Sequence, residues 1–396
     1  MARFQYLMAA AIAVMAGCAS PQRLPPLPLA LAAQASPFSI TNARYYPDTD
    51  GKQLEALGRL SLERERRAIT AKGKSQVLPA ANFLAISGGG DNGAFGAGLL
   101  CGWSARGDRP QFRLVTGVST GALSAPFAYL GSDYDHVLEK LYTTTEASDV
   151  FAPRKKLIAA LSADALTDSE PLRGMVSRFV DRPMIDRIAD EYGKGRLLLI
   201  MTTNLDQGRP VIWNIGAIAE SGHPKSREFI IDILMASSAI PGVFPPVMLD
   251  VSHGGRQYQE MHVDGGTTAQ TFLYPPTFDL RQVSATSGFK RVRNAYIIRN
   301  SRLFREEANV PRQTLSVATE AAATMIAANG TNDAFRIYMT TRRDGVGYNL
   351  AYIDDNFTEP YQGPFDREYM TKLFQYGFSL ARAGYRWHHS PPGFNP

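Results

Sequence analysis

Short apolar runs recur along the chain, and turns rich in glycine or polar residues separate them. Residues 82–87, 112–118 and 197–203 are runs of this kind. An uninterrupted apolar run of about four to eight residues is typical of a strand that is buried on both faces, as in a parallel sheet. The pattern therefore predicts buried strands at these places, and weaker signals predict two more over 209–214 and 293–299.

A β-hairpin is predicted further along the chain. Residues 247–251 and 256–263 read as strands and flank His253-Gly254-Gly255, where the glycines favour a tight turn. The second of these strands runs directly into Asp264-Gly265-Gly266. The hairpin would therefore present the carboxylate of Asp264 at the end of a strand.

Helices are expected between and beyond these strands. A helix is predicted over 53–72, where Leu54, Leu57, Leu60 and Leu62 lie among many charged residues. Residues 152–180 are predicted to form loops and short helical pieces, with a capped helix start before Pro171. Further helices are predicted through Leu100, after Gly121 and over 133–142, 229–239, 313–328, 333–339 and 367–385.

The amino terminus carries the pattern of a bacterial export signal. Arg3 precedes an apolar run over 4–16 that is too short to span a membrane as a helix. The run ends in Met15-Ala16-Gly17-Cys18, which resembles the bacterial lipobox, where cleavage leaves the cysteine as a lipid-modified first residue. This resemblance implies lipid attachment at Cys18 and, since no aspartate follows, the outer membrane of the cell envelope. A plain cleaved signal and an uncleaved anchor are the alternatives.

The net charge of the chain and its distribution limit the kinds of molecule that it is expected to bind. The 42 Lys and Arg residues outnumber the 37 Asp and Glu residues, for a net charge of +5. No basic run stands out, so nucleic-acid binding is not supported, although the sign of the charge permits a weak attraction to anionic lipid.

If Cys18 carries lipid, Cys101 is the only other cysteine and no internal disulfide can form. Apolar neighbours make Cys101 a candidate buried thiol rather than a reactive one.

The most informative stretch follows the run over 112–118, where the chain reads Gly117-Val118-Ser119-Thr120-Gly121. In a Gly-x-Ser-x-Gly motif a strand turns abruptly into a helix, and the strained apex exposes the serine hydroxyl at the carboxyl end of the sheet. Glycines flank the apex because side chains there would collide. The motif makes Ser119 a candidate nucleophile beside a helix amino terminus, which favours developing negative charge. Alone, it also fits an ordinary strand-turn-helix.

A second glycine cluster, Gly88-Gly89-Gly90-Asp91-Asn92-Gly93, lies between a predicted strand and a predicted helix. It satisfies Gly-x-Gly-x-x-Gly, the fingerprint of dinucleotide-binding sites, which would imply a nucleotide cofactor and an oxidoreductase. That fingerprint also needs an acidic residue at the end of the next strand, but this strand ends in Ser119. Consecutive glycines can instead direct several backbone N–H groups into one concave site, which suits an oxyanion hole.

These signals occur in one order along the chain: the glycine cluster, the serine motif and Asp264-Gly265-Gly266. In this combination the chain resembles the patatin-like phospholipase family. Residues 236–246 and 203–208 look like two further stretches of that family. The resemblance covers roughly residues 82–270 and is more specific than any single motif.

The resemblance implies an α/β protein with a three-layer α/β/α fold and a central, mostly parallel sheet. It also implies a serine acyl hydrolase that cleaves carboxylic esters of phospholipids or lysophospholipids without a cofactor or metal ion. Ser119 would be the nucleophile, Asp264 its partner in a Ser/Asp dyad, and Gly88, Gly89 and Gly90 would border the oxyanion hole. Because an exposed aspartate is a feeble base at neutral pH, Asp264 is expected in a sheltered cleft.

The chain departs from the family pattern at one position and leaves two alternatives open. The family's glycine loop usually carries Arg or Lys where this chain has Asn92, so the positive charge beside the oxyanion is missing while the backbone donors remain. A Ser/Asp/His triad would have to draw on His388, His389 or His262, for which solvated or structural roles are expected. A non-enzymatic envelope interaction protein on the same fold is the alternative function.

The predicted organisation follows from these assignments. A lipid anchor followed by a tether would hold the domain near a membrane surface and so near its substrate. The expected divisions are a signal peptide over 1–17, lipidated Cys18 and a proline-bearing tether over 18–37, a helical lead-in over 38–75, a patatin-like catalytic domain over 76–300, and a helical carboxyl-terminal part of the same domain over 301–396.

Overall fold

The computed structural model describes residues 23–71, 73, 78–153, 167–287, 291–303, 310–391 and 393–394. The predicted signal peptide over 1–17 and the predicted lipid-attachment residue Cys18 lie outside the described residues. Among the helices of the described part, none is both long enough and apolar enough to cross a membrane.

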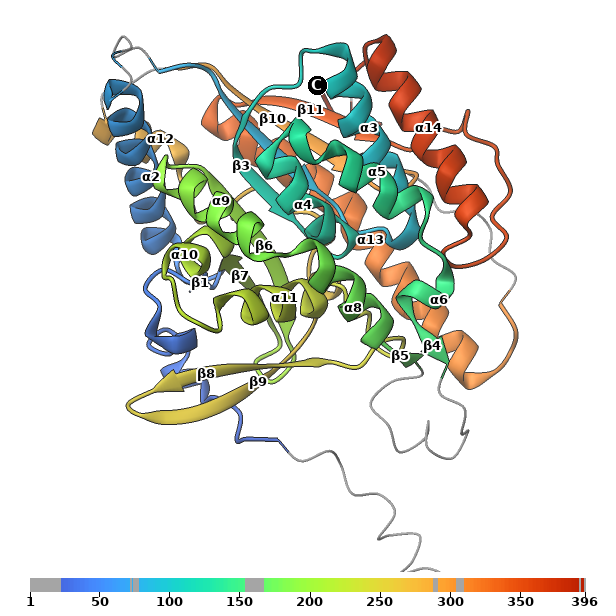
Figure 1. Ribbon diagram of the computed structural model, residues 1–396, viewed down its shortest axis with the longest axis horizontal. Helices are drawn as coiled ribbons and strands as arrows, with labels where there is room; N and C mark the ends of the chain where they lie inside the picture. Colours follow the sequence, from blue (N-terminus) through green and yellow to red (C-terminus); the bar gives the residue numbers. More distant parts are fainter. Residues whose placement is uncertain are drawn as a thin grey trace, which may run out of the picture.

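A nine-stranded sheet forms the centre of the molecule (Figure 1). Its strands β6, β3, β2, β10 and β11 lie side by side in that order and run parallel. Beyond β6, the strands β7 and β1 extend the sheet with antiparallel pairing. The predicted mostly parallel central sheet is therefore confirmed. The bounds are β1 (Arg44–Tyr45), β2 (Ala81–Ile86), β3 (Phe112–Gly117), β6 (Leu197–Asn204), β7 (Arg209–Asn214), β10 (Arg293–Arg299) and β11 (Gly347–Tyr352).

The predicted hairpin is present as β8 (Val247–His253) and β9 (Arg256–Asp264). The carboxyl end of β9 pairs with β6, where Thr202 lies opposite Asp264 and Asn204 opposite His262. This pairing brings the end of β9 into the central sheet. The hairpin therefore carries Asp264 to the edge of the sheet where β3 also ends.

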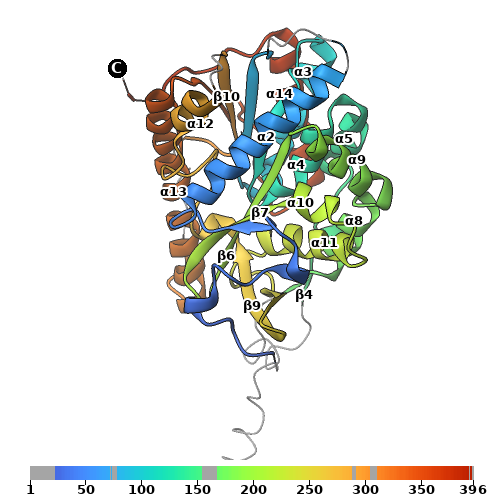
Figure 2. The same cartoon turned by 90° about the vertical axis from the view of Figure 1, so that its left-hand side faces the viewer.

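Helices cover both faces of the sheet, which gives the three expected layers (Figure 2). The continuous apolar runs follow from this arrangement: Leu84 and Ile86 of β2 belong to one core, and Phe83 and Ala85 to the other. One face is covered by α3 (Gly93–Arg106), α4 (Thr120–Leu130), α5 (Asp135–Thr143), α9 (Arg182–Gly193), α11 (Ser226–Ser237) and α14 (Arg367–Ala383). The other face is covered by α2 (Gly51–Ala71), α12 (Leu280–Ser287) and α13 (Thr314–Asp344).

The carboxyl-terminal part differs from the prediction in two ways. One continuous helix, α13, replaces the two helices expected over 313–328 and 333–339. Gly330 does not end the helix but lets it approach the segment after β9 closely, since a Cβ there would lie 3.3 Å from Cβ of Gln270. Strand β11 was not predicted, because Gly347 and Asn349 interrupt its apolar pattern.

Shorter elements complete the chain. The helix α9 was not predicted, although Asp181 caps it by accepting from the amide of Met184 at 2.9 Å. The region predicted as loops and helical pieces contains a two-stranded sheet and short helices, and residues 154–166 within it lie outside the described residues. The remaining elements are α6 (Ala147–Val150), β4 (Ala152–Pro153), β5 (Thr167–Asp168), α8 (Glu170–Phe179) and α10 (Ile215–Glu220).

The segment 23–37 differs from the tether expected over 18–37. Leu27 and Ala35 are buried and pack against Val251 of β8. Ser36 forms an isolated β-bridge with Ser252 at the end of the same strand. The physical reason is that apolar residues lie among the prolines of this segment, and burying them along the hairpin removes them from water.

Candidate active site

Ser119 lies at a sharp turn between β3 and α4, as the serine motif predicts. Its φ of 55° is in the left-handed region that residues other than glycine rarely adopt. A Cβ on Gly117 would lie 2.5 Å from the carbonyl oxygen of Gly121, and a Cβ on Gly121 would collide with the carbonyl oxygen of Ile86. Both glycines are therefore required by close backbone packing at the turn.

Two serines, the last residue of α11 and the residue that follows it, hold this strained turn in place. The amide of Ser119 donates to Oγ of Ser237 at 3.0 Å, and Ser237 in turn donates to the carbonyl of Met201 at 2.7 Å. The hydroxyl of Ser238 donates to the carbonyl of Ser119 at 3.4 Å. The sequence did not reveal these contacts, although Ser237 and Ser238 belong to the stretch 236–246 that carried part of the family resemblance.

The carboxyl group of Asp264 lies near enough to the hydroxyl of Ser119 for that hydroxyl to stabilise its charged form and lower its pKa. The amide of Gly266 donates to Oδ1 of Asp264 at 2.7 Å. Both side chains are sheltered, since Ser119 is 6% exposed and Asp264 is 3% exposed. The structure therefore brings together the two residues that the sequence selected from positions far apart in the chain.

Burial raises the pKa of Asp264 from 3.8 to about 7, although the hydrogen bonds from Ser119 and the Gly266 amide oppose the shift. Removing a carboxylate from water disfavours its charged form, so the group binds a proton more tightly. A carboxylate with this pKa is a far stronger base than an exposed aspartate and is ionised in a large fraction of molecules at neutral pH. The sheltered position expected for Asp264 is confirmed by its exposed fraction.

The three glycines of the loop after β2 have different positions around Ser119. The amide of Gly88 donates to the carbonyl of Gln270 at 3.0 Å, so Gly88 borders the serine without offering a free donor. Gly89 and Gly90 have φ values of 155° and 58°, and within the described residues no backbone acceptor is found for their amides. Their N–H groups are therefore the ones available to an oxyanion.

A buried asparagine that the sequence analysis did not identify fixes this loop. The side chain of Asn300, at the end of β10, donates to the carbonyl of Ser87 at 2.9 Å and accepts from the amide of Gly96 at 3.0 Å. A Cβ on Gly89 would collide with the Asn300 backbone, which explains why glycine is needed there. Asn300 thus connects the loop to the start of α3. No motif in the sequence marked it.

The two polar residues of the glycine loop contact the carboxyl-terminal part of the chain. Asn92, at the family's usual basic position, accepts from the hydroxyl of Tyr369 at 3.0 Å. Asp91 accepts from the hydroxyl of Tyr361 and from the amide of Phe365, at 3.0 Å and 2.9 Å. Burial raises the pKa of Asp91 despite these hydrogen bonds. Both side chains therefore anchor the loop to residues near α14.

The histidines considered for a triad have other partners. His262 is fully buried, with Nδ1 at 2.8 Å from the hydroxyl oxygen of Thr202 and Nε2 at 3.2 Å from Glu260. His388 stacks on Tyr352, and Nδ1 of His389 contacts the carbonyl of Tyr348 at 3.1 Å, both beside the edge strand β11. Among the described residues, no histidine is found in contact with Asp264.

An apolar cleft of about 530 Å³ opens beside Ser119. Its walls come from the start of α4, the end of α5, the segment after α11 and the segments around α8 and α14. Such a cleft suits a hydrocarbon chain, because burying apolar surface drives the chain out of water. The lining residues are Gly90, Ser119, Thr120, Leu123, Leu141, Tyr142, Thr145, Val150, Leu172, Met175, Ser238, Ile240, Phe244, Phe365 and Met370.

Cys101 has the buried position that the sequence predicts. It is 6% exposed, and burial raises the pKa of its thiol, with the carboxylate of Asp135 contributing in the same direction. A thiol with a raised pKa is a poor nucleophile at neutral pH. Cys101 therefore packs as a small apolar residue.

Comparison with protein families finds a match over the part of the chain that contains this site. The family model described as "Patatin-like phospholipase" matches residues 84–275, a span that contains the glycine loop, Ser119 and Asp264. A solved structure of VipD from Legionella pneumophila is 12% identical, with 77% of this chain and 67% of that chain covered, but its TM-score of 0.33 is too low to support a conclusion. The comparison with curated proteins finds no match. The family match supports lipid-ester hydrolysis, and residues 84–275 form a patatin-like phospholipase domain.

Proposed function

We propose that this protein cleaves carboxylic ester bonds of phospholipids or lysophospholipids with Ser119 as nucleophile and Asp264 as its base. The observation that carries the proposal is the interaction of the Ser119 hydroxyl with the buried carboxyl of Asp264, whose pKa burial raises to about 7. A serine hydroxyl attacks an ester only when a base removes its proton in the transition state. Asp264 has the position and the basicity for that task.

Acylation begins when Oγ of Ser119 attacks the ester carbonyl carbon and Asp264 takes the hydroxyl proton. The carbonyl oxygen becomes an oxyanion, which the free amides of Gly89 and Gly90 would stabilise. Loss of one oxyanion donor typically costs about 3 kcal/mol in the transition state. Collapse of the intermediate breaks the ester C–O bond, and Asp264 returns the proton to the leaving alcohol.

Deacylation repeats these steps with water in place of the serine. Asp264 takes a proton from a water molecule that attacks the acyl carbon, and the second tetrahedral intermediate releases Ser119. The products are a fatty acid and the alcohol part of the lipid. The apolar cleft beside Ser119 would hold the acyl chain through both steps, which favours a lipid ester over a small polar one.

The cellular location is a second part of this proposal. The lipobox-like end of the apolar run supports lipid attachment at Cys18 and anchoring at the outer membrane of a bacterial envelope. Replacement of Cys18 by alanine should then move the protein from the membrane fraction to the soluble fraction of cells. An unchanged distribution, with no incorporation of an alkyne-labelled fatty acid into the unaltered chain, would contradict anchoring through Cys18.

The activity is tested by release of fatty acid from mixed phospholipid and lysophospholipid vesicles. The unaltered protein should release fatty acid, and Ser119→Ala and Asp264→Asn should each lose about 100-fold or more of the rate. His388→Ala and His389→Ala are matched controls and should retain it. If Asp264→Asn retains most of the activity, the dyad is wrong; if no lipid is cleaved and Ser119 resists a fluorophosphonate, the non-enzymatic interaction protein is favoured.

A further inference from the structure

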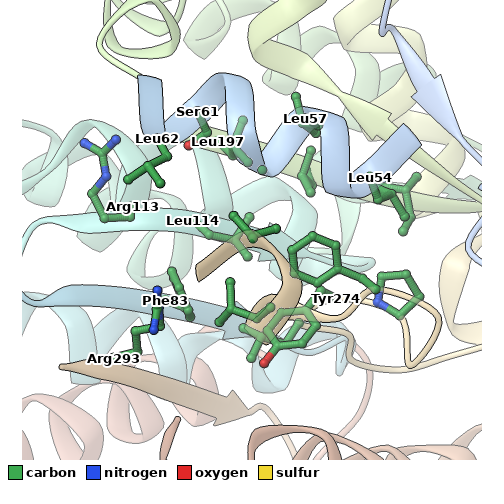
Figure 3. A pocket seen from close by; sticks show the side chains of 18 of the residues that line it. Leu54, Leu57, Ser61, Leu62, Phe83, Arg113, Leu114, Leu197, Tyr274 and Arg293 are labelled. Carbon is green, nitrogen blue, oxygen red and sulfur yellow. The ribbon is translucent and has the colours of Figure 1, made fainter. Parts of the chain in front are cut away.

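A second apolar cavity lies on the face of the sheet that α2 and α12 cover, away from the Ser119 cleft (Figure 3). It contains about 840 Å³ of empty space, part of which is open to solvent. Most of its wall is hydrocarbon, from Leu54, Leu57, Leu62, Phe83, Leu114, Leu197, Leu199, Ile212, Phe272, Leu273, Pro275, Phe278, Leu280 and Val283.

The charged residues that line this cavity are all arginines: Arg113, Arg291 and Arg293. Glu65 of α2 accompanies two of them, with its carboxylate oxygens 3.3 Å from Nε of Arg113 and 2.8 Å from Nη1 of Arg291. Arg293 donates to the hydroxyl of Ser284 at 2.7 Å, and no carboxylate of the described residues is found within ion-pair distance of it. The lining therefore carries more positive charge than Glu65 can balance.

The arginines are gathered at one end of the cavity. Arg293 lies at the start of β10 opposite Ala81, and Arg113 lies at the start of β3, on the other side of β2. Figure 3 shows Arg113 and Arg293 at the same end, with Leu54 toward the opposite end. This arrangement places a cationic end next to an apolar body.

One polar atom at the cationic end also lacks an acceptor. Nε of Arg291 is buried without a hydrogen-bond partner within the described part of the chain, whereas Nε of Arg113 faces the Glu65 carboxylate at 3.3 Å. An unsatisfied buried donor is costly, so a ligand that supplies an acceptor is favoured there. Burial lowers the pKa of Arg113 only to about 10, which leaves its guanidinium charged at neutral pH.

We propose that this cavity binds one long-chain fatty acid, with the carboxylate at Arg293 and the neighbouring arginines and the acyl chain among the leucines of α2 and the sheet. A guanidinium matches a carboxylate in charge and in geometry. A neutral lipid would leave Arg293 without a carboxylate at ion-pair distance, and a sugar or nucleotide would find few polar partners along the hydrocarbon wall. The proposal does not depend on hydrolysis by Ser119.

The site can be located by photochemical crosslinking of the full-length Ser119→Ala protein, which cannot use Ser119 for hydrolysis. A palmitic acid that carries a diazirine in its chain should label peptides from α2 or residues 272–283, as mapped by mass spectrometry. Unlabelled palmitate should compete, and 1-hexadecanol of the same chain length should not. Labelling confined to the Ser119 cleft, or equal competition by the alcohol, would overturn the proposal.

Two variants with a matched control sharpen the test. Arg293→Gln should weaken palmitate competition at these peptides about tenfold, because one charge-assisted contact is lost. Arg281→Gln should leave it unchanged, since Arg281 pairs with Asp279 and does not line the cavity. Gly58→Leu keeps every charge but fills space beside Phe278 and Val283, and it should abolish labelling here. Normal labelling in the folded Gly58→Leu protein, or unchanged affinity in folded Arg293→Gln, would contradict the assignment.

Discussion

At the scale of single residues, the proposed chemistry depends on Asp264 being buried in a form that can still ionise. The same burial that makes the carboxylate basic also makes its charged form unfavourable to the fold. The sequence predicted Ser119, Asp264 and the need for shelter, because these follow from motifs and from the chemistry of a serine nucleophile. It did not predict that the Gly88 amide is occupied, since that contact depends on Gln270, a residue with no motif.

Asp264→Asn should therefore change stability in a pH-dependent way. The folded-state pKa of Asp264 is raised from 3.8 to about 7, so its protonated form contributes stability below about pH 4, and this contribution is lost as pH rises through 7. Relative to the unaltered protein, the variant should gain a few kcal/mol in unfolding free energy between pH 4 and 8, as measured by urea denaturation. A difference that stays constant across this range would mean that Asp264 titrates normally.

At the scale of elements, the site forms where a strand, a glycine loop and a hairpin end meet. Strands with uninterrupted apolar runs and the hairpin turn were predictable, because local sequence determines them. The merged helix α13 and the strand β11 were not, because tertiary packing overrides the local signals of Gly330 and Gly347. The role of Asn300 also depends on tertiary structure. Its partners, the Ser87 carbonyl and the Gly96 amide, lie about 200 residues earlier in the sequence, on either side of the glycine loop.

Asn300→Ala tests whether the glycine loop needs this support. Removal of the amide leaves the Ser87 carbonyl and the Gly96 amide without their partner, which should cost about 1–3 kcal/mol in unfolding free energy. Ester hydrolysis should fall more than the folded fraction does, because Gly89 and Gly90 would be less well positioned. Asn356→Ala is the control, since Asn356 is exposed and bonds to the side chain of Asp354. Full activity per folded molecule in Asn300→Ala would rule out a positioning role.

At the scale of the whole molecule, residues 23–50 before α2 are part of the folded body. Arg44 of β1 is buried, donates to Glu260 of β9 at 2.6 Å, and also donates to the carbonyls of Ala32 and Ala35. It thus connects the segment predicted as a tether to the hairpin that carries Asp264. Composition alone suggested a tether, because prolines in a sequence do not reveal which surface the apolar residues between them will cover.

Arg44→Met should therefore destabilise the fold strongly. It leaves the carboxylate of Glu260, which is fully buried, without its arginine partner, a change that usually costs about 3–5 kcal/mol. Arg59→Ala removes an exposed ion pair with Glu55 and should change stability by less than about 1 kcal/mol. Urea denaturation of both variants at pH 7 would compare them directly. Equal, small effects would show that the Arg44 contact is not needed for stability.

The most direct test of the account is the rate at which a fluorophosphonate labels Ser119 between pH 5 and 9, with the labelled residue identified by mass spectrometry. If Asp264 is the base, the rate should rise about tenfold per pH unit below 7 and level off above it, following the ionised fraction of a group with pKa about 7. Asp264→Asn should react about 100-fold more slowly and without this pH dependence. Labelling of Asp264→Asn at the rate of the unaltered protein, or a rate in the unaltered protein that does not change between pH 5 and 7, would contradict the dyad.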